Sequence, residues 1–173
     1  MAKKKIKISP IFALLSIVCA VVSFGMMFVK SINVVGYSKT EYPYTGLQAV
    51  FGVAGEKTDI TQLEFSFMNL IPYILLAVAV ILIVLSILKR SNNRILNFVI
   101  CGLFIASGIL FFCEGAFTVL GNFFDNGLTG VIGGVSGAKI TVEITVGAIV
   151  AAICSIVGGL SMLASIFTAK KSK

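Results

Sequence analysis

Four long runs of apolar residues, separated by charged or mixed segments, organise this chain. They occupy residues 10–29, 70–88, 95–116 and 144–168. The hydrocarbon core of a bilayer is ~30 Å thick, and a helix needs about 20 apolar residues to cross it. The pattern therefore predicts an all-α membrane protein, in which residues 1–173 form a single integral membrane domain built on a four-transmembrane-helix bundle.

The segments between the runs differ in length and polarity. Residues 1–9, 89–94 and 169–173 are short and cationic, whereas residues 30–69 and 117–143 are long and mix apolar with polar positions. In the long segments, apolar residues often alternate with polar ones. A period of two is typical of a strand with one buried face.

Four stretches show this alternation, at residues 32–34, 47–53, 63–67 and 140–144. Turn-forming residues lie between them, at 42–46, 55–57 and 125–127. We therefore predict a small extracellular antiparallel β-sheet, formed by the two external loops and placed on the outer ends of the helices. The alternative is that both segments are mobile loops whose alternation arises by chance.

Charged residues sort by side. The three short segments hold ten of the fourteen cations and no acid, and all seven acids lie on the other side. Because cationic loops resist translocation, both termini are predicted to be cytoplasmic in a multi-pass plasma membrane protein. The Lys- and Ile-rich composition with short loops favours a bacterial source. The first run also fits a signal peptide cleaved near residue 25, but its length favours retention as a helix.

Composition adds exclusions. Hydrophobic residues make up 58% of the chain, charged residues only 12%, and the mean hydropathy is +1.06, which lies outside the range of soluble domains. The net charge of +7 comes mainly from helix ends and tails, where cations meet anionic headgroups. The lipid bilayer is therefore the expected partner, and nucleic acid is not.

The order of the elements resembles that of claudin-like tetraspan membrane proteins. In that family, four helices with cytoplasmic termini carry a small external sheet, formed mostly by the first external segment with one more strand before the fourth helix. The likeness covers the whole chain but only its architecture. The family's Gly-Leu-Trp motif and following cysteine pair are absent, because Gly46-Leu47 precedes Gln48 and no cysteine lies outside the apolar runs. The resemblance therefore implies a shape and not a cell-junction function.

Residues with catalytic potential are few. The chain has no histidine, and its aspartates, Asp59 and Asp125, lie outside the runs, which excludes a paired-aspartate intramembrane protease. None of the four cysteines forms Cys-x-x-Cys, so they indicate buried small side chains. Ser107 and Ser155 are expected to bond back to their own helix backbone. We therefore predict no enzyme, no cofactor and no metal site.

Glu114 is the one polar residue with a specific functional hypothesis. Its neighbours on both sides are apolar, and an ionisable group within a membrane is by default a candidate for a proton or cation relay. Alternatively, Glu114 lies about 20 residues along its helix, at the outer interface, where it can pair with Lys30. The position favours this structural role.

Small residues recur every four positions in the last run, at Gly147, Ala151, Ser155 and Gly159. Such a helix-packing ridge lets two helices approach closely, within the bundle or with another membrane protein or a second copy. Residues 46–52 and 127–133 also share Gly, Leu, Val and Gly in register, which fits either two related halves or chance similarity in a glycine-rich chain.

Two classes of function remain. The first is a non-enzymatic integral membrane scaffold or accessory subunit, whose external sheet contacts a partner or the cell envelope. The alternative is a small transporter or channel component that uses Glu114 near its pathway. Because the runs contain few polar residues apart from serine, the sequence favours the first class.

Overall fold

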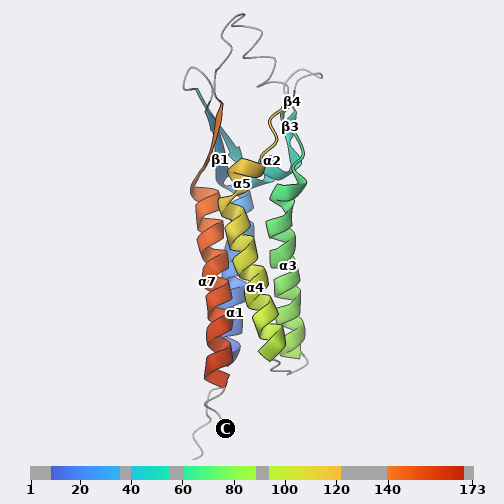
Figure 1. The fold of residues 1–173 in the computed structure, drawn as a ribbon, viewed down its shortest axis with the longest axis vertical. Coiled ribbons are helices and arrows are strands. Elements are labelled where there is room, and N and C mark those ends of the chain that lie inside the picture. Colours follow the sequence, from blue (N-terminus) through green and yellow to red (C-terminus); the bar gives the residue numbers. More distant parts are fainter. Residues whose placement is uncertain (1–8, 36–39, 55–60, 89–93, 122–139, 170–173) are drawn as a thin grey trace, which may run out of the picture.

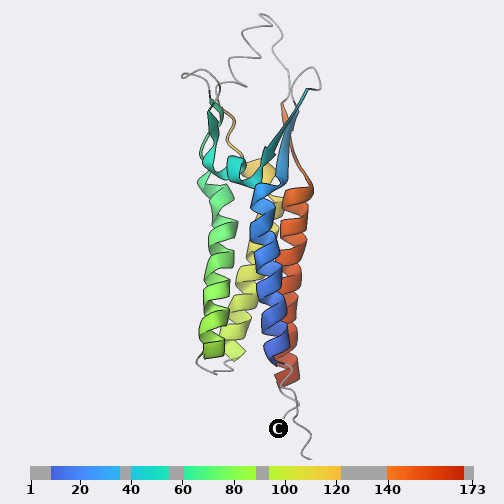
Figure 2. The ribbon, with the colours of Figure 1, turned by 180° about the vertical axis from the view of Figure 1, so that it is seen from behind.

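The computed structural model describes residues 9–35, 40–54, 61–88, 94–121 and 140–169. Four long helices run side by side along the longest axis (Figures 1 and 2): α1 (Ser9–Gly25), α3 (Phe67–Leu88), α4 (Arg94–Phe112) and α7 (Val146–Ala169). All four are long and apolar enough to cross a membrane. The prediction of a four-helix bundle is thereby confirmed, and each helix lies in one of the predicted runs or begins close to it.

A small antiparallel sheet lies at one end of the bundle (Figure 1). Its central strand is β1 (Lys30–Val35), which pairs with β2 (Glu41–Thr45) on one side and β5 (Thr141–Ile144) on the other. A second pair consists of β3 (Val53–Ala54) and β4 (Thr61–Leu63). Both long segments contribute strands, as predicted, and the stretches at 32–34 and 140–144 are the ones that pair through β1 and β5.

The predicted strand at 47–53 is wrong over most of its length, because residues Gly46–Phe51 form the helix α2. Thr45 and Gln48 form a capping box, in which each side chain bonds to the other residue's backbone and starts the helix. Gly46, Ala49 and Val50 are buried, which is helical rather than strand spacing. The helix stops at Gly52, whose φ of 83° favours glycine.

Two neighbouring predictions also need correction. The expected turn at 42–46 is mostly the strand β2, since Pro43 lies on the edge of the sheet, where its missing N–H costs no ladder bond. The predicted strand at 63–67 ends at Leu63, and Phe67 already belongs to α3 because the Ser66 hydroxyl caps that helix by accepting from the Asn69 N–H. The turns at 55–57 and 125–127 lie outside the described residues.

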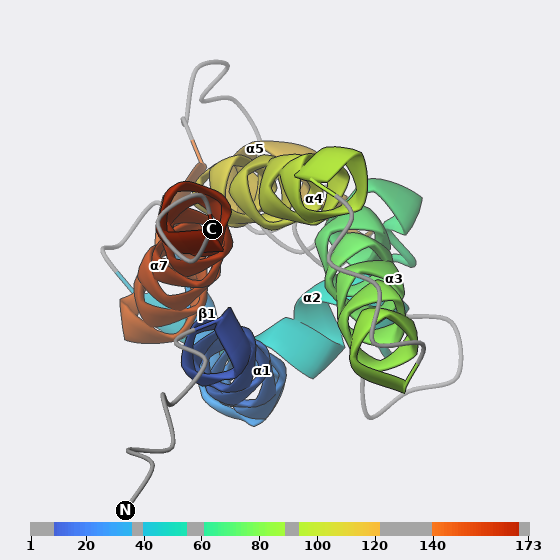
Figure 3. The ribbon, with the colours of Figure 1, turned by 90° about the horizontal axis from the view of Figure 1, so that it is seen from below.

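Seen along its axis, the bundle places the helices in the order α1, α7, α4, α3 (Figure 3). The most extensive contacts are those of α7 with α4 and α1, and α3 packs mainly on α4. Helices α1 and α3 touch far less. The last helix in the chain is therefore the central packing element, and α1 reaches the rest of the bundle chiefly through it.

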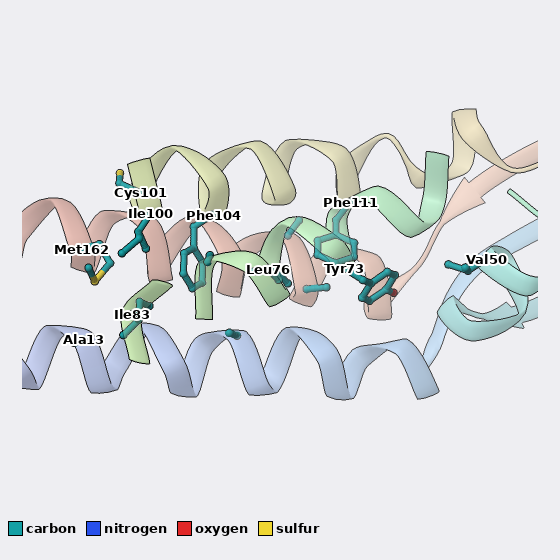
Figure 4. Close-up of a cluster of buried hydrophobic side chains, with 14 residues drawn as sticks. Ala13, Val50, Tyr73, Leu76, Ile83, Ile100, Cys101, Phe104, Phe111 and Met162 are labelled. Atoms are coloured by element: carbon teal, nitrogen blue, oxygen red, sulfur yellow. The ribbon is translucent and has the colours of Figure 1, made fainter. Parts of the chain in front are cut away.

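Apolar side chains fill the interior at two levels. Within the bundle, a cluster that includes Leu76, Ile83, Ile100, Phe104 and Phe111 is almost completely buried (Figure 4). Under the sheet, a second cluster consists of Ile32, Val34, Tyr44, Ala49 and Leu63. Glu114 is buried as well, but it belongs to neither cluster and its carboxyl accepts a hydrogen bond from Ser31 of β1.

Candidate functional site

Glu114 lies where the third long helix gives way to the sheet. Helix α4 ends at Phe112, and after Cys113 the short helix α5 (Glu114–Phe117) begins. The predicted span 95–116 is thus interrupted before its expected end. The backbone leaves helical geometry at Cys113, with φ −92° and ψ 1°, and α5 then packs on β5, where a Cβ on Gly115 would lie 3.3 Å from the Val142 carbonyl oxygen.

A β-bulge turns Ser31 toward Glu114. Lys30 pairs with Thr45 and Ile32 with Tyr44, so Ser31 is an extra residue in β1. A bulge changes the direction of a side chain, so two successive residues can both be buried: Ser31 is 1% exposed and its neighbour Ile32 is 0% exposed. The Ser31 hydroxyl donates a 2.5 Å hydrogen bond to Glu114 Oε2. This bond joins the first strand of the sheet to the element that follows α4.

The carboxyl group of Glu114 is enclosed by protein, with only 1% of the residue exposed. Burial raises the pKa of this carboxyl from 4.5 to about 7, although the hydrogen bond from Ser31 acts to lower it. Its Oε1 atom is buried without a hydrogen-bond partner. The structure does not place Glu114 in water beside Lys30, whose side chain is exposed; Ser31 is the residue that contacts the carboxyl.

Further polar side chains connect Glu114 to α3. The Asn69 amide Nδ2 donates to the Ala49 carbonyl and to Thr118 Oγ1, both at 3.2 Å, and the Thr118 hydroxyl donates to the Glu114 carbonyl at 2.9 Å. The Ser66 hydroxyl donates to the Phe117 carbonyl at 2.7 Å. We call Ser31, Ser66, Asn69, Glu114 and Thr118 the polar junction. It joins β1, α3 and α5 at one level.

The backbone at Lys30 and Ser31 also anchors α7. The Thr145 N–H donates to the Ser31 carbonyl at 2.7 Å, and the Thr145 hydroxyl donates to the Lys30 carbonyl at 2.6 Å. A Cβ on Gly147 would lie 2.5 Å from that Lys30 carbonyl oxygen. Glycine at the start of α7 is therefore what allows the helix to approach β1 so closely.

The predicted helix-packing ridge lies inside the molecule. Gly147 faces β1, and the Ala151 carbonyl accepts a 3.0 Å hydrogen bond from the Ser23 hydroxyl of α1. Ser155 Oγ lies 3.2 Å from Ser23 Oγ, and a Cβ on Gly159 would lie 3.1 Å from the Cys101 carbonyl oxygen of α4. These contacts occupy the ridge with α1, β1 and α4 of the same chain.

Serines supply most of the polar contacts between the long helices. Ser16 Oγ of α1 lies 2.5 Å from Ser161 Oγ of α7 and donates to the Gly158 carbonyl at 2.8 Å. Ser155 bonds back to its own helix at Ala151, as predicted. The same prediction for Ser107 is wrong, since its hydroxyl donates across to the Pro72 carbonyl of α3 at 2.9 Å. This bond ties α4 to α3 within the bundle.

Few chemical roles fit this arrangement. Among the described residues, no three His, Cys, Asp or Glu side chains gather in a way that could hold a metal ion. The cysteines, Cys19, Cys101, Cys113 and Cys154, are free thiols. The polar junction has one acid and hydroxyl or amide groups around it, so it can accept hydrogen bonds and a proton. The sequence does not predict Ser31 as the partner of Glu114, because Ser31 stands out there only as a polar residue next to an alternating stretch.

Comparison with known proteins adds no relative from which a function could be transferred. The claudin-like likeness remains an expectation about shape, and function has to be argued from the site and its surroundings. No protein-family model, curated protein or solved structure gives a significant match to this chain.

Proposed function

We propose that this protein is a non-enzymatic scaffold or accessory subunit of a plasma membrane, which holds a small sheet outside the bilayer for contact with a partner protein or the cell envelope. The observation that carries the proposal is the attachment of the sheet. Strand β1 is tied to α5 through Ser31 and Glu114, and to α7 through Thr145. A sheet joined to several helices is a rigid surface, as a binding platform requires.

The filling of the bundle supports this function over transport. Phe104, Ile100 and Leu76 are 0% exposed and Ile83 is 1% exposed, and they occupy the middle of the interior (Figure 4). The serines between α1 and α7 bond to each other and to backbone carbonyls. A pathway for ions would need polar groups in line along the bundle. Within the described long helices, the interior holds apolar side chains and serines whose hydroxyls already bond to backbone carbonyls, and no charged side chain is buried there.

The orientation follows from the charges. The ends of α1, α3, α4 and α7 that lie away from the sheet are those joined to the cationic segments 1–9, 89–94 and 169–173. Under the positive-inside rule this end faces the cytoplasm with both termini, and the sheet lies outside. In this arrangement the protein would share the general plan of claudin-like tetraspan proteins, without their cell-junction motif.

The contact surface we propose is the solvent-exposed part of the three-stranded sheet. Thr141 and Glu143 of β5 are exposed, and β5 is an edge strand in the described sheet. Edge strands offer backbone groups for pairing and side chains for selectivity. The bilayer covers the long helices, and a partner membrane protein or a second copy would meet the sheet.

Site-specific photo-crosslinking in cells tests the proposal. A photoreactive amino acid at Glu143 should give a light-dependent product of defined mass, whether with another protein or with a second copy. The matched control is Leu160, which is 51% exposed on α7 and faces the lipid in this proposal. Absence of a product from both Thr141 and Glu143, together with ion flux in vesicles containing the purified protein, would overturn the scaffold function in favour of a transporter or channel component.

A further inference from the structure

The environment of Glu114 sets an electrostatic problem. A buried carboxylate is costly unless an opposite charge or several hydrogen bonds stabilise it. Glu114 is 1% exposed and accepts one hydrogen bond, from Ser31, while its Oε1 has no partner. Either the charge is removed by a proton, or the group is held at a considerable cost.

Among the described residues, no positive side chain acts on the Glu114 carboxyl to compensate its charge. Of the elements packed against Glu114, α3 contributes Tyr73, which is close enough for an electrostatic interaction but is a neutral or negative group. The exposed side chains of Lys30 on β1 and Glu143 on β5 point into solvent. Cys113 precedes Glu114, and α5 itself has no other titratable residue. Among the titratable groups that the structure describes, Tyr73 is therefore the one that shares this buried environment.

We propose that Glu114 is a proton-binding site of the folded protein, and that the bound proton holds α5 against β1. With the proton bound, the group is neutral and compatible with burial. When the proton leaves, the charged carboxylate is more stable in water than in the buried site, and it can reach water only if α5 moves away from Ser31. The proposal concerns the site itself and stands whichever partner the sheet contacts.

The position of the site gives the proton an effect beyond one side chain. Thr118 bonds to the Glu114 carbonyl, and the Lys30–Ser31 backbone receives both bonds from Thr145 at the start of α7. Loosening of α5 from β1 would therefore loosen the sheet from the bundle. Because the folded protein binds this proton more tightly than the unfolded chain does, stability should be greatest at acid pH. It should fall as the pH rises from about 4.5 to about 7 and then level off.

Infrared spectroscopy of the full-length protein in lipid nanodiscs measures the proton directly. The carbonyl stretching band of a protonated carboxyl should persist in the wild type and disappear with a midpoint near pH 7. Glu114→Gln should lack this component, whereas Glu143→Gln, the same change at an exposed site, should keep it. A band that disappears only in the ordinary acidic range of glutamate, identically in all three proteins, would overturn the proposal.

A second variant keeps the test open if Glu114→Gln fails to fold. Ser31→Ala removes the hydrogen bond that favours the charged form, so the midpoint should move to higher pH. An unchanged midpoint would show that the titrating group is not Glu114. The titration is repeated in NaCl and in choline chloride: an unchanged midpoint supports a proton as the ligand, and a midpoint that falls with added Na⁺ contradicts it by indicating a cation site.

Discussion

Gly147→Ala should destabilise the junction between α7 and β1. The new Cβ would lie 2.5 Å from the Lys30 carbonyl oxygen, 3.0 Å from its carbon and 3.2 Å from the Ser31 Cα, all of which are backbone atoms. Ordinary contact begins near 3.4 Å, so the two backbones must separate by about 0.9 Å. A flexible side chain could turn aside, but a strand held on both edges cannot.

The size of the effect follows from two losses and one partial gain. Overpacking of this kind costs about 1–3 kcal/mol, and weakening one of the Thr145 bonds to β1 costs about 1 kcal/mol. The better helix propensity of alanine offsets up to about 1 kcal/mol. A net loss of about 2 kcal/mol should lower the melting temperature by about 4–8 °C in a chain of this length.

The assay is thermal unfolding in mild detergent, followed with a thiol-reactive dye that reports exposure of the four free cysteines. Gly102→Ala is the matched control, since a Cβ there meets nothing within 4 Å. In the middle of α4 it should be neutral or raise the melting temperature by about 1–4 °C. Equal shifts for the two variants would refute the close approach of α7 to β1.

Further variants test the packing of the long helices by the same assay. Gly159→Leu should destabilise the bundle strongly, because the new side chain would push α7 away from the α4 backbone, and Ser155→Leu should push α7 away from α1 in the same way. Leu160→Ile, at an exposed position, should leave the melting temperature nearly unchanged, and equal tolerance at all three positions would show that the ridge is not an interface. Ser107→Ala should lower stability by about 1 kcal/mol, since it removes the buried hydrogen bond from α4 to the Pro72 carbonyl of α3, and no change in melting temperature would contradict that contact.

The main elements could be predicted from the sequence because each depends on a pattern within one segment. Each long helix follows from a run of apolar residues, because burial in a membrane or a protein core stabilises such a helix whichever element it packs against. Strands β1 and β5 alternate in the sequence as they do in the structure, with Ile32, Val34 and Val142 on the apolar positions. For α2, alternation was the wrong signal, and the Thr45-x-x-Gln48 capping box was the local feature that decided the structure.

The site was predicted only in part, because its partner depends on long-range geometry. Glu114 stands out as an acid between apolar residues, whereas the choice between Lys30 and Ser31 depends on a bulge in the pairing of β1 with β2. The cross-helix bond of Ser107 has the same origin, since which carbonyl faces a serine is set by how α3 and α4 pack. The similarity between residues 46–52 and 127–133 stays untested, because 127–133 lies outside the described residues.

The central claim is that four helices cross the membrane with the sheet outside, and labelling of single cysteines in intact cells tests it most directly. The native cysteines are replaced first, and a cysteine is then placed at residue 56, 92 or 171. An impermeant thiol reagent should label Glu56→Cys in intact cells, and should label Asn92→Cys and Lys171→Cys only after the membrane is permeabilised. Labelling of Asn92→Cys in intact cells, or protection of Glu56→Cys, would contradict the account.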